Sequence, residues 1–226
     1  NDDRNQYHLM QFNKYEVIKN NAFDNVLEIG CGPFTNLRVI ANVCKIKECS
    51  LLDPLIFDYL DHPFCSYNRE YLFSESFPLF GKIISKILPN SYKFYLKNLS
   101  QKIMIKELLN IPVEKIALTN KYDLVTMINV IEHYYDIQKL FQNIIEITEK
   151  DSYLIFSDKL YHHTQIIEEI KLGYDAAHPL KVDKQVVETF LYDNFEITYK
   201  KIQTNTMTLE GETLTWDDIY FIGKKK

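Results

Sequence analysis

The stretch of sequence that decides the fold is Val26-Leu27-Glu28-Ile29-Gly30-Cys31-Gly32-Pro33-Phe34-Thr35-Asn36-Leu37. An apolar run, residues 26–29, passes into a Gly-x-Gly turn, and a helical pattern follows. This order is typical of a buried parallel strand that hands over to a helix beside a bound nucleotide. The two glycines allow positive φ angles and a close approach of the backbone to a ligand. We expect Thr35 or Asn36 to cap the following helix.

Two classes of nucleotide-binding protein use such a turn. Dinucleotide-binding Rossmann proteins have G-x-G-x-x-G, and here Thr35 stands where the third glycine is expected. The stretch E-I-G-C-G-P instead resembles motif I of the class I S-adenosylmethionine-dependent methyltransferases. The resemblance implies a loop that holds the methionine end of the cofactor, formed by Glu28, Gly30, Cys31 and Gly32. A Gly-x-Gly turn without any ligand is the alternative for this motif taken alone.

The size and charge of the chain limit its class. Its 226 residues suffice for one domain with a sizeable core, and 46% hydrophobic with 25% charged residues is ordinary for a soluble globular protein. The formal net charge of −5 argues against a nucleic-acid partner held by phosphate contacts. No apolar stretch approaches the ~20 residues of a membrane span, and no signal peptide is visible.

The cysteines indicate a reducing compartment. Four cysteines occur without a C-x-x-C or a zinc-like spacing, and Cys31 lies inside the glycine loop, where a disulfide would be awkward. We therefore expect free thiols and a cytoplasmic protein. The chain begins at Asn1 rather than Met, which leaves open an N-terminal piece or further domains of a larger polypeptide.

A second motif follows the glycine-loop helix. Residues 49–53 read as a short strand that ends in Asp53, and Pro54 forces the chain out of it. Asp53 lies 21 residues after Gly32, the expected place for a carboxylate bonded to ribose hydroxyls. In the family that the sequence resembles, this acid accepts hydrogen bonds from both ribose hydroxyls of S-adenosylmethionine. A strand-end Asp that merely caps a turn is the alternative.

Two segments lie outside the minimal pattern. Residues 1–22 contain an expected N-terminal helix over residues 7–20. Residues 55–101 are a long insertion that is dense in aromatic residues, and the spacing of apolar residues over 80–88 predicts at least one helix there. We interpret the insertion as a helical lid over the carboxyl ends of the strands, where open α/β folds bind ligands. Its aromatic residues are equally expected to form a small core of their own.

Two further stretches resemble methyltransferase motifs. Residues 111–116 resemble the segment after the third strand, which places Val113 and Glu114 beside the adenine, although Pro112 replaces the usual Asp. The stretch Y-D-L-V-T-M-I-N-V-I-E-H, residues 122–133, resembles the fourth strand and its following turn. It implies that Asn129 and Val130 contact the methionine portion. Some relatives bind a divalent metal through Glu-x-x-Glu-His here, but this chain has Asn129 at the first position, so we expect no metal site.

The rest of the chain completes an α/β pattern. We expect a fifth strand at 153–158, helices at 166–172 and 182–192, and two closing strands at 195–199 and 220–223. Residues 204–216 read as a polar connector between these last strands. The prediction is a single α/β domain over residues 1–226, with a Rossmann-like, seven-stranded, mostly parallel sheet and helices on both faces.

The chemistry of methyl transfer points to a histidine. S-adenosylmethionine already carries an activated methyl group, so the protein must align an acceptor and, for a hydroxyl acceptor, remove a proton. We favour His178 as the base, with Asp175 as its partner and His133 beside the site. His162 and His163, with Asp158, are further candidates, whereas His8 and His62 are assigned no role.

The sequence therefore predicts a class I S-adenosylmethionine-dependent methyltransferase that acts on a small molecule or a glycan, at oxygen. The product of the cofactor would be S-adenosylhomocysteine. Two alternatives remain: an inactive cofactor-binding module of a larger protein, and a nicotinamide-dependent oxidoreductase. Glu28 and the missing third glycine argue against the oxidoreductase.

Overall fold

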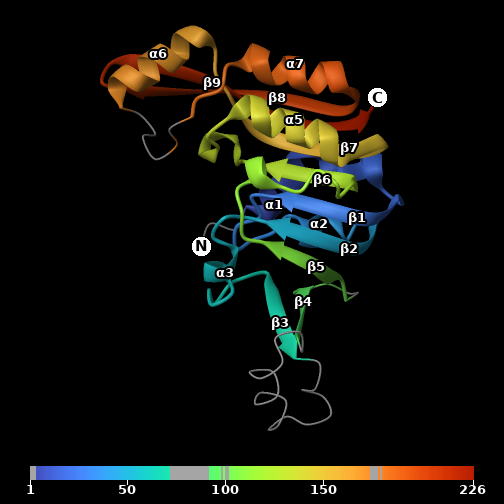
Figure 1. The fold of residues 1–226 in the computed structure, drawn as a ribbon. Helices are drawn as coiled ribbons and strands as arrows, with labels where there is room; N and C mark the ends of the chain where they lie inside the picture. The colour runs from blue at the N-terminus through green and yellow to red at the C-terminus, as the bar shows by residue number, and fades with distance from the viewer. Residues whose placement is uncertain (1–3, 72–91, 98, 100–101, 174–177, 179) are drawn as a thin grey trace.

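The computed structural model describes residues 4–71, 92–97, 99, 102–173, 178 and 180–226 (Figure 1). The strands of these residues form one sheet of nine, in the order β3-β4-β5-β2-β1-β6-β7-β9-β8. Their bounds are β1 Ala22–Ile29, β2 Lys45–Leu52, β3 Tyr67–Tyr71, β4 Tyr92–Leu96, β5 Met104–Leu109, β6 Tyr122–Ile128, β7 Thr148–Leu160, β8 Phe195–Leu209 and β9 Glu212–Lys225.

The centre of the sheet is parallel. β5, β2, β1, β6 and β7 pair in parallel, and an antiparallel pair flanks them at each side, β4 with β3 and β9 with β8. In Figure 1 the arrowheads of the parallel strands all point to one edge of the sheet. The Rossmann-like α/β prediction is confirmed, with two strands more than the expected seven. The extra pair, β3 and β4, comes from the insertion.

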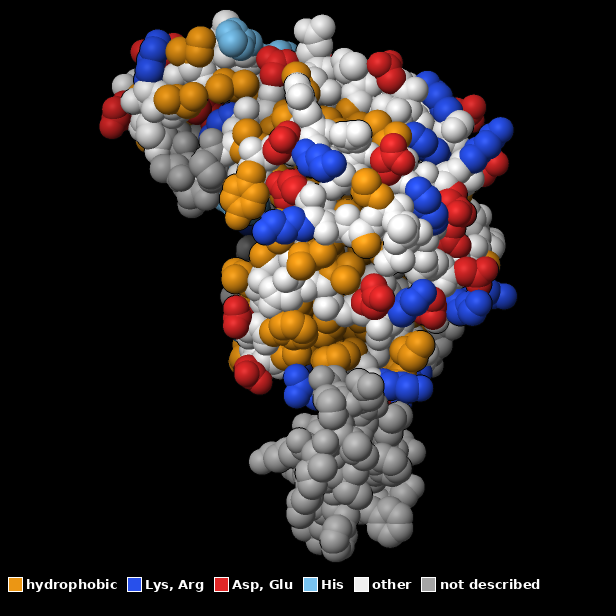
Figure 2. All heavy atoms as spheres, viewed as in Figure 1, with side chains coloured by type: hydrophobic (Ala, Val, Ile, Leu, Met, Phe, Trp, Pro, Cys, Tyr) orange, Lys and Arg blue, Asp and Glu red, His pale blue; other side chains and the backbone are white. Residues whose placement is uncertain are grey.

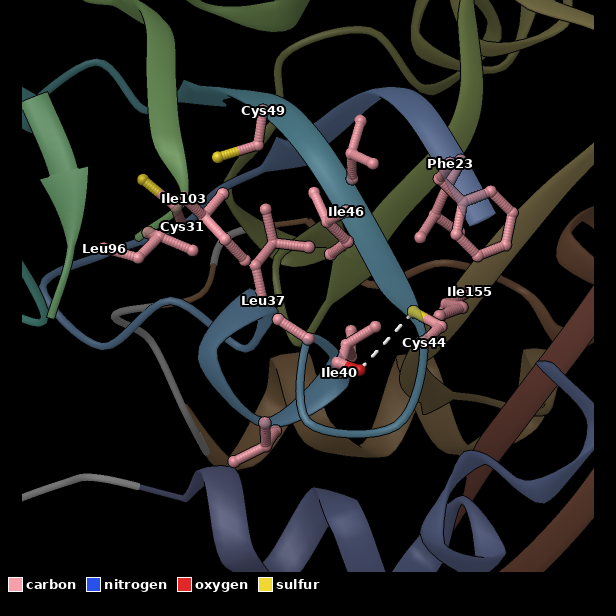
Figure 3. Close-up of a cluster of buried hydrophobic side chains, with 14 of the residues drawn as sticks. Phe23, Cys31, Leu37, Ile40, Cys44, Ile46, Cys49, Leu96, Ile103 and Ile155 are labelled. Atoms are coloured by element: carbon pink, nitrogen blue, oxygen red, sulfur yellow. Dashed lines mark hydrogen bonds between the residues drawn. The ribbon is translucent and has the colours of Figure 1, made fainter. Parts of the chain in front are cut away.

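Helices cover both faces of the sheet. On one face lie α1 Asn5–Gln11, the 3₁₀ helix η1 Asn13–Ile18 and α2 Leu37–Ile40, and on the other lie α5 Ile137–Ile147 and α7 Lys184–Asn194. The remaining short elements are α3 Ile56–Tyr59, η2 Val113–Lys115, η3 Ile131–His133 and α6 His163–Leu172. Each face buries its own hydrophobic cluster, and Figure 3 shows part of the cluster on the α1–α2 face. The apolar central strands are buried on both sides, as parallel strands are.

The expected N-terminal helix is broken. α1 ends at Gln11, and Asn13, Lys14 and Tyr15 have positive φ angles of 47°, 55° and 56°. Left-handed backbone cannot continue an α-helix, so a separate 3₁₀ turn follows. The break turns Tyr15 inward, where its side chain is fully buried against Phe12.

The insertion contributes strands as well as helix. Its described part contains the short helix α3 and the antiparallel strands β3 and β4, which extend the sheet beyond β5. The helix expected over residues 80–88 lies outside the described residues. Leu55 and Tyr59 line a cavity at the carboxyl edge of the sheet, on the side where a lid was expected.

The expected polar connector over residues 204–216 is wrong. These residues form the outer half of a long hairpin, in which β8 and β9 pair from Phe195–Lys225 to Leu209–Glu212. Glu210 and Gly211 form the turn with φ angles of 52° and 89°, the conformation that matches strand twist in a two-residue hairpin. In this part of β8 exposed residues alternate with partly buried ones, so polar side chains are tolerated on the exposed side. The many polar residues led to the prediction of a loop.

The surface mixes charges of both signs. Figure 2 shows acidic and basic side chains interspersed over the viewed face rather than gathered into one basic patch. Among the described residues, the helices include none that is long and apolar enough to cross a membrane.

Candidate active site

Three adjoining cavities lie at the carboxyl edge of the parallel strands. The loop cavity, about 490 Å³, is lined by Gly30, Gly32, Pro33, Leu52, Asp53, Pro54, Leu55, Tyr59, Pro112, Asn129, Val130, His133, Tyr134 and Tyr135. The bridging cavity, about 230 Å³, shares Gly30, Gly32, Pro33 and Asn129 with it. The hairpin cavity, about 360 Å³, shares Arg4, His8 and Asn129 with the bridging cavity. Asn129 therefore lines all three.

The glycine loop lies between β1 and α2. Gly30 has a φ of 67°, and its N–H donates to the carbonyl of Leu52 at 2.7 Å. A Cβ at this position would lie 2.2 Å from Cγ1 of Val130, so only glycine fits without movement. Gly32 has a φ of 50°, and a Cβ there would meet nothing within 4 Å. The backbone at Gly32 is thus open toward the cavities that it lines.

Glu28 supports the loop from beneath. Its carboxylate accepts hydrogen bonds from the Thr35 hydroxyl and from the backbone N–H of Asn36, the latter at 2.9 Å. Glu28 is 2% exposed, and burial raises its pKa to about 7 despite these hydrogen bonds. Asn36 stands at the N-cap of α2 without the expected side-chain cap, because its amide turns toward Glu28. Thr35 Oγ1 accepts from the N–H of Leu37 instead.

Asp53 joins the end of β2 to the glycine loop. One carboxylate oxygen accepts from the N–H of Gly32 at 3.2 Å, and the other accepts from the N–H of Leu55 at 2.9 Å. Both bonds leave lone pairs on a carboxylate that lines the loop cavity. Tyr59 lies beside it, and burial followed by the charge of Asp53 raises the pKa of this phenol to about 12.

Glu114 lies next to Tyr135, a residue that lines the loop cavity, but Glu114 itself is not among the lining residues. One of its carboxylate oxygens accepts from the N–H of Tyr135 at 3.0 Å, whereas the other is buried without a hydrogen-bond partner. Val113 is fully buried, and its carbonyl accepts from Asn143 at 3.0 Å. A buried carboxylate oxygen with no partner is costly unless a ligand or water supplies a donor.

The turn after β6 is held by Asp158 of β7. One oxygen of Asp158 accepts from the N–H groups of Val130 and Ile131 at 2.8 and 2.7 Å. Burial raises the pKa of Asp158 to about 7. Asn129 adopts a φ of 58° and donates its N–H to the carbonyl of Ser157 at 2.7 Å. This turn aims Asn129 at the meeting point of the cavities.

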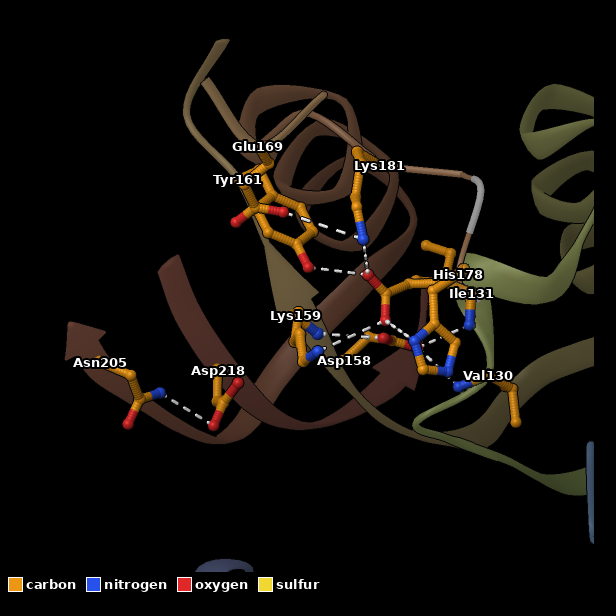
Figure 4. A network of polar contacts seen from close by, with 11 residues as sticks. Val130, Ile131, Asp158, Lys159, Tyr161, Glu169, His178, Lys181, Asn205 and Asp218 are labelled. Atoms are coloured by element: carbon orange, nitrogen blue, oxygen red, sulfur yellow. Dashed lines mark hydrogen bonds and ion pairs between the residues drawn. The ribbon is translucent and has the colours of Figure 1, made fainter. Parts of the chain in front are cut away.

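A buried charge cluster, which we call the Glu132 cluster, lies behind this turn (Figure 4). The Glu132 carboxylate accepts from the Tyr161 hydroxyl at 2.8 Å and lies 3.5 Å from Lys181 Nζ and 3.7 Å from Lys159 Nζ. His178 Nδ1 lies 3.9 Å from the same carboxylate, and the His178 ring meets His133 edge-on at 4.7 Å between centroids. The two candidate histidines are therefore neighbours, and His133 lines the loop cavity. Asp175 lies outside the described residues.

A family model described as a methyltransferase domain matches residues 4–189. The chain belongs to this methyltransferase family. The match spans the glycine loop, Asp53 and the turn after β6, so the motifs and the family agree.

Solved structures share the fold of this methyltransferase. A putative methyltransferase from Bacillus halodurans superposes with a TM-score of 0.61 at 12% identity, covering 97% of each chain. The YcgJ protein from Bacillus subtilis gives 0.60 at 10% identity, covering 98% of this chain and 99% of that one. The N-methyltransferase NodS from Bradyrhizobium japonicum, solved with S-adenosylhomocysteine, gives 0.53 at 13% identity, covering 100% and 88%. No curated protein sequence matches the chain significantly.

These comparisons confirm the predicted enzyme class. The methyltransferase has the family and the fold of the class I S-adenosylmethionine-dependent enzymes, and the NodS structure holds the product of that cofactor in the same fold. The described residues contain no group of three or more His, Cys, Asp or Glu side chains that could hold a metal ion.

Sequence reasoning missed the hairpin cavity of the methyltransferase. Besides Asn129 and three residues of β7, Ser157, Asp158 and Lys159, it is lined by residues from the start of the described chain and from the β8–β9 hairpin, namely Arg4, Tyr7, His8, Asn205, Trp216, Asp218 and Tyr220. Asp218 accepts from the Asn205 amide at 3.0 Å across the hairpin. The available signal was the alternation of threonine with apolar residues over 206–216 around Glu210-Gly211, which predicts a hairpin rather than a loop.

Proposed function

We propose that this methyltransferase transfers a methyl group from S-adenosylmethionine to an oxygen atom of a small polar molecule, with sugars and glycans as the first class to test. The observation that carries the proposal is the meeting of the loop and hairpin cavities at Asn129. Cofactor and acceptor need two adjacent compartments with a common border. A cavity of about 490 Å³ is also in the range of small-molecule and cofactor sites.

Features of the loop cavity fit the cofactor. No atom lies within 4 Å of where a Cβ of Gly32 would be, so a ligand can approach the backbone there closely. The carboxylate of Asp53 also lines this cavity and can accept hydrogen bonds from ribose hydroxyls. The partnerless oxygen of Glu114 is suited to accept from the exocyclic amine of adenine. In the proposal Gly30, Cys31, Asn129 and Val130 border the methionine end, Pro54 and Val113 flank the nucleoside, and Glu28 acts by holding the loop. The bound cofactor supplies the activated methyl group.

The hairpin cavity suits a polar ring compound. Tyr7, Trp216 and Tyr220 provide aromatic faces, and Asn205 and Asp218 provide hydrogen-bonding groups. Sugar rings combine an apolar face, which packs on aromatic side chains, with a rim of hydroxyls, which bind to polar side chains. The chain's task is to hold one hydroxyl at the border near Asn129 and to remove its proton. The prediction from the sequence that His178 removes this proton, with His133 and Asp175 nearby, stays a prediction.

The first experiment is calorimetric titration of the chain with S-adenosylhomocysteine and, separately, with NAD. We expect micromolar binding of the first and no binding of the second. Binding of NAD alone would favour the oxidoreductase, and binding of neither would leave an inactive fold.

The single tryptophan of the chain provides a second readout. Trp216 lines the hairpin cavity, so its emission should change when an acceptor binds there. Monosaccharides and phenols are first titrated into the chain saturated with S-adenosylhomocysteine to find compounds that bind. Methyl transfer to these compounds from S-adenosylmethionine labelled in its methyl group then identifies the acceptor. Mass spectrometry of the product then distinguishes O-methylation from N-methylation. Cofactor binding without transfer to any acceptor would favour the inactive module.

We also propose that residues 1–226 act as one domain, since strands from both ends of the described chain share one sheet. Four buried free cysteines favour the cytoplasm as its location.

A further inference from the structure

The helix α1 places His8 at the border of two cavities. His8 lines both the bridging cavity and the hairpin cavity, and its side chain is 8% exposed. Asn5, one turn earlier on α1, donates its side-chain amide to the carbonyl of Thr35 at 2.7 Å. α1 is therefore attached to the glycine loop, and His8 is held against the place where the loop and Asn129 meet.

The hydrogen bond of His8 fixes the position of its ring proton. His8 Nδ1 lies 2.8 Å from the amide oxygen Oδ1 of Asn36. An amide oxygen can only accept, so Nδ1 must carry the proton and donate it. In the neutral ring the basic lone pair then belongs to Nε2.

Glu28 fixes the direction of that bond. The Asn36 amide nitrogen donates to Glu28 Oε1 at 3.4 Å, and the Asn36 backbone N–H donates to the same oxygen at 2.9 Å. Because a carboxylate accepts, the amide nitrogen of Asn36 faces Glu28 and its oxygen faces His8. Glu28, Asn36 and His8 thus form a chain of oriented hydrogen bonds.

We propose that His8 is the general base of the reaction, accepting the proton of the acceptor hydroxyl at Nε2, with Asn36 and Glu28 as its positioning residues. The inference rests on the proposed O-methylation. In the transfer, a lone pair of the acceptor oxygen would form the new O–C bond while the C–S bond of the cofactor breaks and its electron pair stays on sulfur, which leaves S-adenosylhomocysteine. The O–H electron pair stays on the acceptor oxygen and the proton passes to Nε2. The ring becomes an imidazolium with a proton on each nitrogen, and Asn36 Oδ1 and the Glu28 carboxylate behind it stabilise this charge.

His133 and His178 occupy a different place. His133 lines the loop cavity, and the two rings contact each other beside the Glu132 cluster. Neither is among the residues that line the hairpin cavity. His8 is the histidine that borders both the glycine loop and the hairpin cavity among the described residues.

The tautomer of His8 can be measured without knowing the acceptor. Long-range ¹H–¹⁵N NMR of the ¹⁵N-histidine-labelled chain, saturated with S-adenosylhomocysteine at pH 8, distinguishes protonated from unprotonated ring nitrogens, and His8→Gln assigns the signal. We expect neutral His8 to carry its proton on Nδ1. His62 serves as an internal control, because its Nδ1 accepts from the N–H of Phe64 at 3.3 Å and its proton should sit on Nε2. Asn36→Ala should abolish the His8 preference and leave His62 unchanged.

The outcomes separate this inference from the proposed function. Failure of the wild-type chain to bind S-adenosylhomocysteine overturns both. Binding with the His8 proton on Nε2 overturns the inference and leaves the methyltransferase proposal standing. On the acceptor found in the panel, His8→Gln should lower kcat about 10²- to 10⁴-fold with unchanged affinity for S-adenosylhomocysteine, whereas His62→Gln should not. Transfer by His8→Gln at the wild-type rate would refute the assignment.

Discussion

Val130 packs directly over Gly30, so that an added Cβ at Gly30 would fall 2.2 Å from Val130 Cγ1 and 2.9 Å from Val130 Cβ. The contact joins the loop after β1 to the turn after β6, the two sides of the candidate cofactor crevice. Since Asp158 binds the N–H groups of Val130 and Ile131, this neighbour has little freedom to move away.

Gly30→Ala should therefore lower stability more than Gly32→Ala does. Both variants force alanine into a positive φ, at a cost of roughly 1–2 kcal/mol. Only Gly30→Ala adds overpacking against Val130, for roughly 1–3 kcal/mol more. Urea unfolding measures both, and Val130→Ala combined with Gly30→Ala should recover part of the loss. Equal destabilisation by the two single variants would contradict the packing argument.

Asp53→Ala should weaken binding of S-adenosylhomocysteine. Loss of charge-assisted hydrogen bonds to ribose hydroxyls costs roughly 1.5–3 kcal/mol, or about 10- to 150-fold in Kd. Calorimetric titration provides the measurement, and Asp58→Ala, at an exposed position on α3, provides the control. Affinity at the wild-type level in Asp53→Ala would remove this residue from the ribose site.

Glu28 should make the fold less stable as the pH rises. Its pKa is about 7 in the folded chain, where burial opposes the charge, against an ordinary value of 4.5. Between these values the folded chain holds a proton that the unfolded chain has released, so the free energy of unfolding falls as pH increases from about 4.5 to 7. The full effect is up to about 3 kcal/mol.

Urea unfolding of Glu28→Gln at pH 5 and pH 8 tests this sign. The variant should lose less stability between the two pH values than the wild type does, while Asp158, whose pKa is also about 7, keeps contributing in both. Glu212→Gln, on the exposed start of β9, is the matched control. A pH dependence identical to that of the wild type would show that Glu28 is not the titrating group.

Glu132→Gln should destabilise the fold strongly. The carboxylate is 4% exposed and faces Lys159 and Lys181, and the Lys181 side chain is itself only 6% exposed. Removing one partner of a buried charge pair leaves the other charge uncompensated, at a cost of roughly 3–5 kcal/mol. Thermal unfolding should show the loss, whereas Glu168→Gln, in an exposed pair with Lys171, should change little. A small effect at Glu132 would mean that Glu169 alone holds Lys181.

The central strands could be predicted from the sequence because local patterns encode them, whereas their order in the sheet comes from the structure. The apolar runs that end in Gly30, Asp53 and Asn129 are strands buried on both faces, and their polar ends face one edge of the sheet. The prediction for residues 204–216 failed although a local signal was present. Residues 206–209 and 213–216 alternate threonine with apolar residues on either side of Glu210-Gly211, which is the pattern of a β-hairpin.

By itself, the sequence determined the strand ends that form the candidate cofactor site, because glycines, strand-end acids and their spacing are local features tied to a known chemistry. Only the tertiary structure decided which residues surround the hairpin cavity and that His8 is oriented by Asn36. That hydrogen bond joins side chains 28 positions apart. Such contacts exist only after α1 has packed against the glycine loop. Polar groups of α1 then bind polar groups of the loop instead of groups close to them in the sequence.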